Sequence, residues 1–191
     1  MRIGIYGGTF NPPHLGHVHA ARYAARSLGL DRLMLIPSGK TPCKPVPELT
    51  ASPEQRLRML SIAFGSVPIA EVSSMELDRG GESYTWETVR QIRRDNPEAE
   101  LFLLLGTDMF LKFPQWVDAD RLCGEVTLVS MNRGEKGERE NLIRAAARIE
   151  SMGGKTVLLD NPVTFISSSQ VRRLLAFEGA DSFLPEGLLS Y

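Results

Sequence analysis

Cysteine and histidine, the residues that build disulfide frameworks and most metal sites, are scarce in this chain. Among 191 residues there are 2 cysteines, Cys43 and Cys123, and 3 histidines. Two isolated cysteines exclude a disulfide scaffold and lack the spacing of a zinc site, which is typical of a protein from a reducing compartment. A chain of this length can bury a core without such cross-links, so we expect a single domain over residues 1–191.

An excess of charge and long apolar runs are also missing. The chain carries 22 basic and 23 acidic residues, so general binding to nucleic acid is not expected and phosphate recognition should be local. No apolar run reaches membrane-spanning length, and the strand pattern at the start leaves no room for a signal peptide. We therefore expect a cytoplasmic protein with no membrane or nucleic-acid partner. The oligomeric state stays open, with a homo-oligomer among the outcomes allowed.

What the chain does contain is a regular alternation of apolar runs and amphipathic segments. Strand patterns occupy residues 3–6, 32–37, 69–73, 100–105, 125–131 and 155–159, and helical patterns occupy residues 15–28, 53–64, 85–94 and 138–152. Such alternation is typical of βαβ units. The sequence therefore predicts an α/β fold with a Rossmann-like parallel sheet flanked by helices.

Two glycines and two histidines meet at the first strand-to-helix junction. Gly7 and Gly8 end the first strand, where missing side chains let backbone N–H groups approach a ligand. His14 and His17 are three residues apart at the positive N-terminal end of the next helix, where both rings can donate to one anion. A metal site that also uses His19 is disfavoured, because His19 projects from another face. We interpret the junction as a nucleotide phosphate site.

A second glycine follows the nearly continuous apolar run 100–105, which predicts a central strand. Gly106 gives backbone access, and the carboxylate of Asp108 can accept hydrogen bonds from ribose hydroxyls. Trp116 offers a flat face on which a ligand ring can stack, with an ordinary core tryptophan as the alternative. Near the C-terminus, Ser167 and Gln170 form a predicted capping box, which presents another helix N-terminus.

Basic residues surround the loop after the second strand. Lys40 and Lys44 lie in this Pro-rich loop, where they are either phosphate ligands or solvated side chains. Arg56, in the first turn of the helix that Ser52 caps, faces the same loop, and we expect it to be solvated.

Both glycine-rich and serine-rich segments resemble signatures of the nucleotidylyltransferase superfamily. The sequence GGTFNPPHLGH resembles the His-x-Gly-His element, and ISSSQVR resembles Ile-Ser-Ser-Thr-x-Ile-Arg with serine in place of threonine. The Gly106 to Trp116 segment and Ser83-Tyr84-Thr85 narrow the resemblance to the bacterial nicotinate-nucleotide adenylyltransferase family. Cys43 departs from that family, which commonly has a histidine at this place.

The resemblance implies transfer of AMP from ATP to nicotinate mononucleotide, giving deamido-NAD and pyrophosphate. It implies catalytic roles for His14, His17 and Arg172, with Mg²⁺ carried by the ATP phosphates and no residue assigned as a metal ligand. The substrate-binding residues that it implies are Gly7, Gly8, Thr9, Phe10, Lys44, Ser83, Tyr84, Thr85, Gly106, Asp108, Trp116, Arg133, Ile166, Ser167 and Ser169.

Other functions remain compatible with the motifs. A nicotinamide mononucleotide, pantetheine-phosphate or cytidylyl transferase would share both signatures, although the segment from Gly106 to Trp116 argues against the last two. A nucleotide-binding module without turnover is disfavoured by the intact histidines and Arg172. The His-x-Gly-His element is also similar to that of class I aminoacyl-tRNA synthetases, but the chain has no length for a tRNA-binding domain.

Overall fold

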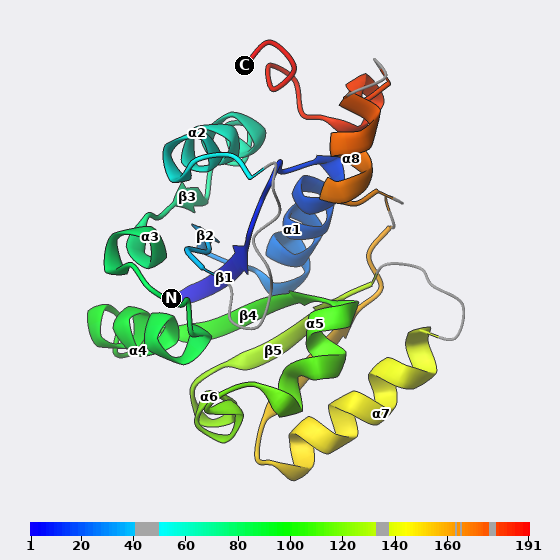
Figure 1. The fold of residues 1–191 in the computed structure, drawn as a ribbon. Helices are drawn as coiled ribbons and strands as arrows, with labels where there is room; N and C mark the ends of the chain where they lie inside the picture. Colours follow the sequence, from blue (N-terminus) through cyan, green and yellow to red (C-terminus); the bar gives the residue numbers. More distant parts are fainter. Residues whose placement is uncertain (41–49, 133–137, 163, 165, 176–178) are drawn as a thin grey trace.

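The computed structural model describes residues 1–40, 50–132, 138–162, 164, 166–175 and 179–191. Its centre is a six-stranded sheet in the order β3-β2-β1-β4-β5-β6, and every adjacent pair of strands is parallel (Figure 1). The predicted α/β fold with a Rossmann-like parallel sheet is confirmed. No helix in the described part of the chain is both long enough and apolar enough to cross a membrane.

One or two helices connect each strand to the next along the chain. The strands are β1 (Arg2–Gly8), β2 (Arg32–Pro37), β3 (Ala70–Val72), β4 (Glu100–Gly106), β5 (Thr127–Met131) and β6 (Lys155–Leu159). The helices are α1 (Leu15–Leu28), α2 (Pro53–Phe64), α3 (Met75–Arg79), α4 (Thr85–Asp95), α5 (Thr107–Lys112), α6 (Ala119–Glu125), α7 (Glu138–Ser151) and α8 (Ser168–Leu175), with 3₁₀ turns η1 (Phe113–Gln115) and η2 (Asp181–Phe183).

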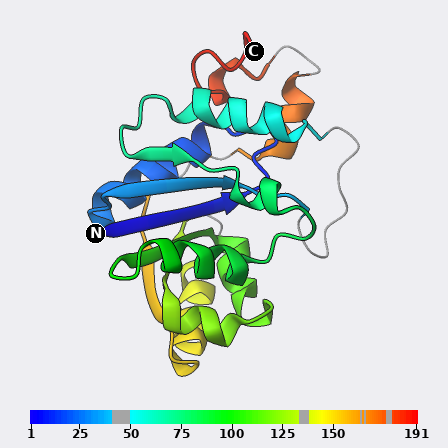
Figure 2. The same ribbon diagram turned by 90° about the vertical axis from the view of Figure 1, so that its left-hand side faces the viewer.

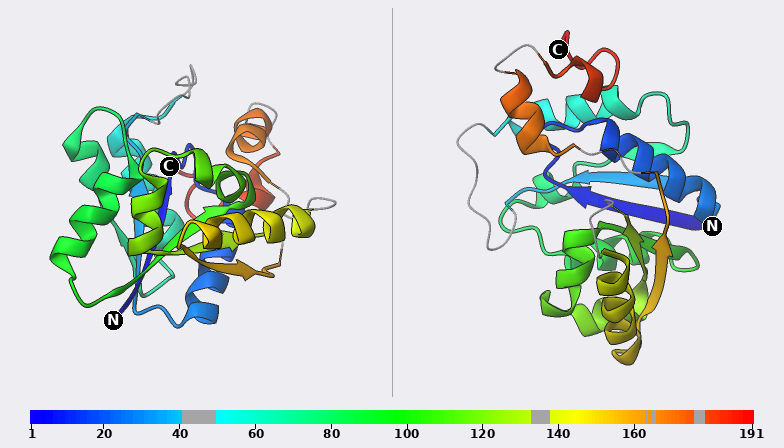
Figure 3. Two further views of the ribbon diagram at one scale, coloured as in Figure 1. Left: turned by 90° about the horizontal axis from the view of Figure 1, so that it is seen from below. Right: turned by 90° about the vertical axis from the view of Figure 1, so that its right-hand side faces the viewer.

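The core lies on both faces of the sheet because successive strand residues point to opposite sides. In β4, Leu101, Leu103 and Leu105 pack with α4 to α7, whereas Phe102 and Leu104 pack with α1 and α2. Figure 2 shows α2 and α4 on opposite sides of β1 and β2, and Figure 3 shows α7 and α1 on opposite sides of β6. Burial on both faces explains why β4 is an almost unbroken apolar run.

The order of the strands positions the site. From β1 the chain moves outward through β2 and β3, then returns to place β4 on the other side of β1. In parallel sheets, ligands bind outside the carboxyl ends of the strands at such a reversal. Here Gly8 ends β1 and Gly106 ends β4. Both predicted glycine turns therefore lie at the edge where a ligand is expected.

Most predicted boundaries are confirmed, and a few are wrong for local reasons. β5 begins at Thr127 because Glu125 still belongs to α6. Ser83 and Thr85 are both residue types that commonly cap helices and were the caps expected for the helix at 85–94. The N-cap of α4 is instead Tyr84, since the Ser83 hydroxyl accepts a hydrogen bond from the Gly39 N–H at 2.8 Å. No helix was predicted between residues 73 and 85, but this segment contains helix α3, and β3 itself is shorter than residues 69–73.

Candidate active site

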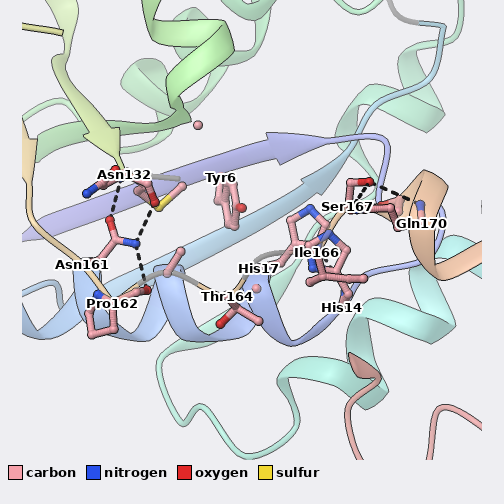
Figure 4. A pocket seen from close by; sticks show the side chains of 15 residues that line it. Tyr6, His14, His17, Asn132, Asn161, Pro162, Thr164, Ile166, Ser167 and Gln170 are labelled. Carbon is pink, nitrogen blue, oxygen red and sulfur yellow. Dashed lines mark hydrogen bonds between the residues drawn. The ribbon is translucent and has the colours of Figure 1, made fainter. Parts of the chain in front are cut away.

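A pocket of about 340 Å³ opens at the carboxyl edge of the sheet. Figure 4 shows Asn132, Asn161 and Pro162 at one end, and His14, His17, Ser167 and Gln170 at the other. Among the residues predicted for the site, His14, His17, Gly106, Ile166 and Ser167 line this pocket. The remaining lining residues are Tyr6, Gly16, Ala20, Met131, Asn132, Asn161, Pro162, Thr164, Ser168 and Gln170.

His14 and His17 are held together at the start of α1. His14 is the N-cap, and its backbone N–H donates to Nδ1 of His17 at 3.2 Å. The two ring centroids are 3.7 Å apart with an interplanar angle of 31°. Because Nδ1 of His17 accepts this hydrogen bond, a neutral ring carries its proton on Nε2. The backbone of the helix start thus prepares His17 to donate a hydrogen bond from Nε2.

Gly16 lets the His14 ring lie close against the helix. A Cβ atom at this position would stand 3.0 Å from Nδ1 of His14 and 3.4 Å from Cγ2 of Ile166. The first distance is shorter than an ordinary van der Waals contact, so any larger residue would displace the buried imidazole. The glycine between the two histidines therefore leaves the room in which the His14 ring packs.

The turn from Gly7 to Phe10 leads from β1 into this helix start. Phe10 has a positive φ of 49° and is 2% exposed. Its ring packs edge-on against Tyr6 at 5.4 Å and against His17 at 5.2 Å. Gly7 and Thr9 are exposed, whereas the Phe10 side chain is committed to packing. A ligand would therefore contact the backbone of Phe10, while the Phe10 ring packs against His17.

Helix α8 brings the second signature against the first. Nη1 of Arg172 donates to the carbonyl oxygen of Asn11 at 2.5 Å, and Nη2 donates to Oγ of Ser169 at 3.2 Å. The Ser168 hydroxyl donates to the carbonyl oxygen of Pro12 at 2.9 Å. Other N–H groups of the guanidinium can still bind an anion. Two segments about 160 residues apart in sequence thereby form one edge of the site.

The Ser167 side chain closes the helix start that the sequence predicted. Its hydroxyl oxygen accepts from the Gln170 N–H at 3.3 Å and donates to Oε1 of Gln170 at 2.9 Å. One half of the predicted capping box, the bond from the Gln170 N–H to the Ser167 hydroxyl, is confirmed, while the Gln170 side chain accepts from the Ser167 hydroxyl and not from its backbone N–H. The helix N-terminus of α8 consequently faces the pocket with its cap formed.

The residues predicted to hold the pyridine end, and Asp108 predicted to bind the ribose, do not line the pocket. Tyr84 donates from its hydroxyl to Oε2 of Glu82 at 2.6 Å. Thr85 is the first residue of α4, and Asp108 is exposed in the first turn of α5. Trp116 is half-buried, with its ring 5.5 Å from that of Phe113. Lys44, Cys43 and Arg133 fall outside the described residues.

Asn132 and Asn161 were not predicted from the sequence. The Asn161 side chain accepts from the Asn132 N–H at 2.7 Å and donates to the Asn132 carbonyl oxygen at 3.1 Å. This pair joins the chain after β5 to the chain after β6, as a strand partner would. Their position in the sequence could have indicated them as site residues, because each asparagine lies within two residues of the end of a parallel strand.

The prediction that Arg56 is solvated is wrong. Its side chain is 4% exposed, and Nη1 donates to the carbonyl oxygens of Thr9 at 3.1 Å and Ser38 at 2.6 Å. Burial lowers the pKa of its guanidinium. The cap at Ser52 starts α2 at Pro53, and this start directs position 56 inward toward the loops that follow β1 and β2.

A metal ion would find few ligands from the protein here. Among the described residues, no group of three or more His, Cys, Asp or Glu side chains is arranged to hold one. The lining residues that the structure describes carry imidazoles, hydroxyls and amides but no carboxylate. Mg²⁺ prefers oxygen ligands, so in this pocket it would take most of them from a bound phosphate and from water.

The sequence comparisons agree with the two signatures. A family model described as Cytidylyltransferase-like matches residues 5–174. Relatives from Listeria monocytogenes (strain F2365) and Gemmatimonas aurantiaca, both named probable nicotinate-nucleotide adenylyltransferase, are 33% and 35% identical to this chain. Each similarity covers 100% of this chain, together with 93% of the Listeria protein and 89% of the Gemmatimonas protein.

Solved structures share the fold. The nicotinic acid mononucleotide adenylyltransferase of Plasmodium falciparum, complexed with NaAD and with APC, superposes with a TM-score of 0.76 in both cases. The similarity covers 100% of this chain and 93% of the Plasmodium chain, at 19% and 17% identity. The chain belongs to the cytidylyltransferase-like family and, within it, to the nicotinate-nucleotide adenylyltransferases.

Proposed function

We propose that this chain, acting as a single domain in the cytoplasm, transfers AMP from ATP to nicotinate mononucleotide and releases pyrophosphate. The observation that carries the proposal is the junction of the two signatures. His17 is oriented by the His14 N–H, and Arg172 is fixed to the Asn11 carbonyl oxygen three residues before His14. Donors from α1 and α8 thus meet at the reversal point of a parallel sheet, where a nucleotide phosphate fits. The names of the relatives support the choice of substrates.

The reaction needs positioning and charge stabilisation more than covalent chemistry. An oxygen of the mononucleotide phosphate attacks the α-phosphorus of ATP in line, and the bond to the departing pyrophosphate breaks. His17 donates from Nε2 to the oxygens on which charge develops, and His14 beside it donates to the same group of phosphates. In this scheme no side chain forms a covalent intermediate.

Other cationic and hydroxyl groups hold the two ends of the reacting phosphate chain. Arg172 and Ser169, already in contact at 3.2 Å, bind the departing pyrophosphate. Lys44 and Arg133 are the proposed ligands of the attacking phosphate. Mg²⁺ carried by the ATP phosphates neutralises part of their charge. Because the described residues that line the pocket include no carboxylate, their side chains present mainly donors to the phosphates.

The pyridine end is proposed to lie beside Trp116, with Ser83 to Thr85 supplying neutral donors. The Ser83 oxygen accepts from Gly39, which leaves its hydroxyl proton for another acceptor. A carboxylate only accepts hydrogen bonds, so it suits such donors better than an amide does. Asp108, exposed in the first turn of α5, is proposed to accept from ribose hydroxyls.

The test is pyrophosphate release with MgATP and a panel of acceptors. The panel contains nicotinate mononucleotide, nicotinamide mononucleotide, phosphopantetheine and glycerol phosphate. We expect the highest kcat/KM with nicotinate mononucleotide. Release with phosphopantetheine or glycerol phosphate alone would reassign the chain to another transferase, and release with none of the four would reduce it to a nucleotide-binding module.

A further inference from the structure

Arg56 is a buried cation without an acidic partner among the described residues. It lies in the first turn of α2 and is 4% exposed. Its Nη1 atom donates to the carbonyl oxygens of Thr9 and Ser38, while its buried Nε–H has no hydrogen-bond partner within the described part of the chain. A buried charge is costly unless it is paired and fully hydrogen-bonded. Packing alone would be served better by an apolar side chain.

The two carbonyl groups that Arg56 holds belong to adjacent strand ends at the ligand edge. Thr9 follows β1 and Ser38 follows β2, and the Ser38 N–H donates to the Gly8 carbonyl oxygen at 2.8 Å. The next carbonyls along the turn are also taken by side chains from α8. Arg172 holds that of Asn11, and Ser168 holds that of Pro12. In the turn before His14, a side chain of α2 thus binds the Thr9 carbonyl, and side chains of α8 bind those of Asn11 and Pro12.

Arg93 offers a comparison within the same chain. Its Nη1 atom also donates to two carbonyl oxygens, those of Pro97 at 3.1 Å and Ala99 at 2.6 Å. These residues precede β4, at the opposite edge of the sheet from the pocket. Arg93 also forms an ion pair with Glu125 at 2.9 Å. Far from the site, the arginine that donates to two carbonyl oxygens, Arg93, thus has a counter-ion. Beside the site, Arg56 makes the same pair of hydrogen bonds with no counter-ion among the described residues.

We propose that Arg56 is a positioning residue for adenylyl transfer. It holds the Thr9 and Ser38 carbonyls so that the turn after β1 presents His14 and His17 to the phosphates, and the bound phosphates compensate its charge. This inference rests on the proposed function. It assigns the arginine an indirect role, exerted through the turn and through charge, and not a contact with the reacting atoms.

The experiment compares Arg56→Met, Arg56→Lys and the matched control Arg93→Met. Methionine removes the charge and the donors with little change in side-chain length, whereas lysine keeps the charge and can donate to a carbonyl. For each protein we would measure kcat and KM for both substrates, the melting temperature, and the rise in melting temperature on adding MgATP or pyrophosphate. A bound ligand raises the melting temperature by mass action, so this rise reports binding without turnover.

We expect Arg56→Met to lower kcat by about 10- to 100-fold, the range that a small misplacement of catalytic groups costs. Its melting-temperature rise with MgATP and pyrophosphate should shrink, and Arg56→Lys should restore part of both losses. Arg93→Met should melt at a lower temperature with normal kcat and a normal ligand-induced rise. If Arg56→Met does not fold, the same comparison is made between Arg56→Lys, with an intermediate kcat expected, and Arg93→Met.

A purely structural Arg56 would give a different pattern. Near-normal kcat and a full ligand-induced rise in the folded Arg56 variants, or matching behaviour of the Arg56 and Arg93 variants, would overturn the proposal. Failure of the proposed function would be recognised separately, because the wild-type chain would then release no pyrophosphate with nicotinate mononucleotide.

Discussion

Two groups of residues predicted for the site, a histidine half and a tryptophan half, are built differently. In the histidine half, formed by Tyr6, His14, His17 and α8, side chains and loop carbonyls are tied together by hydrogen bonds and ring contacts. In the tryptophan half, formed by Ser83 to Thr85, Asp108 and Trp116, the residues stand on separate elements outside the pocket. A preorganised region suits transition-state stabilisation, whereas a dispersed one suits recognition that the substrate completes.

Removal of His17 should have the largest effect. We expect His17→Ala to lower kcat by at least about a hundredfold, because it removes a donor aimed at developing charge. The control is His19→Ala, since His19 is exposed on the same helix and its ring contacts the Thr164 hydroxyl at 3.0 Å. Steady-state kinetics and a thermal melt on both variants make the comparison. A folded His17→Ala protein with near-normal kcat would end the idea of a preorganised histidine half.

Displacement of His14 should cost less. Gly16→Ala places a Cβ about a few tenths of an ångström too close to the imidazole, so we expect kcat to fall about tenfold. The matched control is Gly124→Ala in α6, where an added Cβ meets nothing within 4 Å. That control should raise stability by about 0.4 to 1 kcal/mol without changing kcat. Equal kinetics for the two variants would show that the position of His14 does not matter.

Replacement of Arg172 by lysine should have a smaller effect again. The guanidinium contacts Asn11 and Ser169 at once, which a single ammonium group reproduces poorly. Loss of about one hydrogen bond corresponds to about a fivefold drop in kcat/KM for ATP. The neighbouring Arg173 is exposed, so Arg173→Lys serves as the control. Unchanged kcat/KM for ATP in Arg172→Lys would show that Arg172 only holds the turn in place and does not bind ATP.

The elements predicted best from the sequence were those with strong local signals. The predictions for residues 32–37 and 15–28 match β2 and α1, and the predicted cap at Ser52 starts α2. Helices α3, α5 and α6 were not predicted, because elements of 5 to 7 residues contain too few turns to establish a period.

Within the site, the histidine half could be predicted from the sequence because glycine turns and helix starts are local sequence features. The burial of Arg56 was not readable, because it depends on carbonyl groups 47 and 18 residues away. The Asn132 and Asn161 pairing likewise depends on how two strand ends meet. Residues that support a site through long-range contacts carry no periodic or motif signal of their own.

The central claim is that the histidine half stabilises the transition state and the tryptophan half recognises the substrate. Its most direct test is the ratio of kcat/KM for nicotinate mononucleotide to kcat/KM for nicotinamide mononucleotide at saturating MgATP. The ratio is measured in wild type, His17→Ala and Trp116→Ala. An amide in place of the carboxylate leaves a buried group unpaired at about 1 to 3 kcal/mol, so we expect a wild-type ratio of about 5 to more than 100. His17→Ala should lower both values and keep the ratio, whereas Trp116→Ala should reduce the ratio several-fold. Equal kcat/KM values in wild type, or a ratio that falls to about 1 in His17→Ala and is unchanged in Trp116→Ala, would contradict this claim.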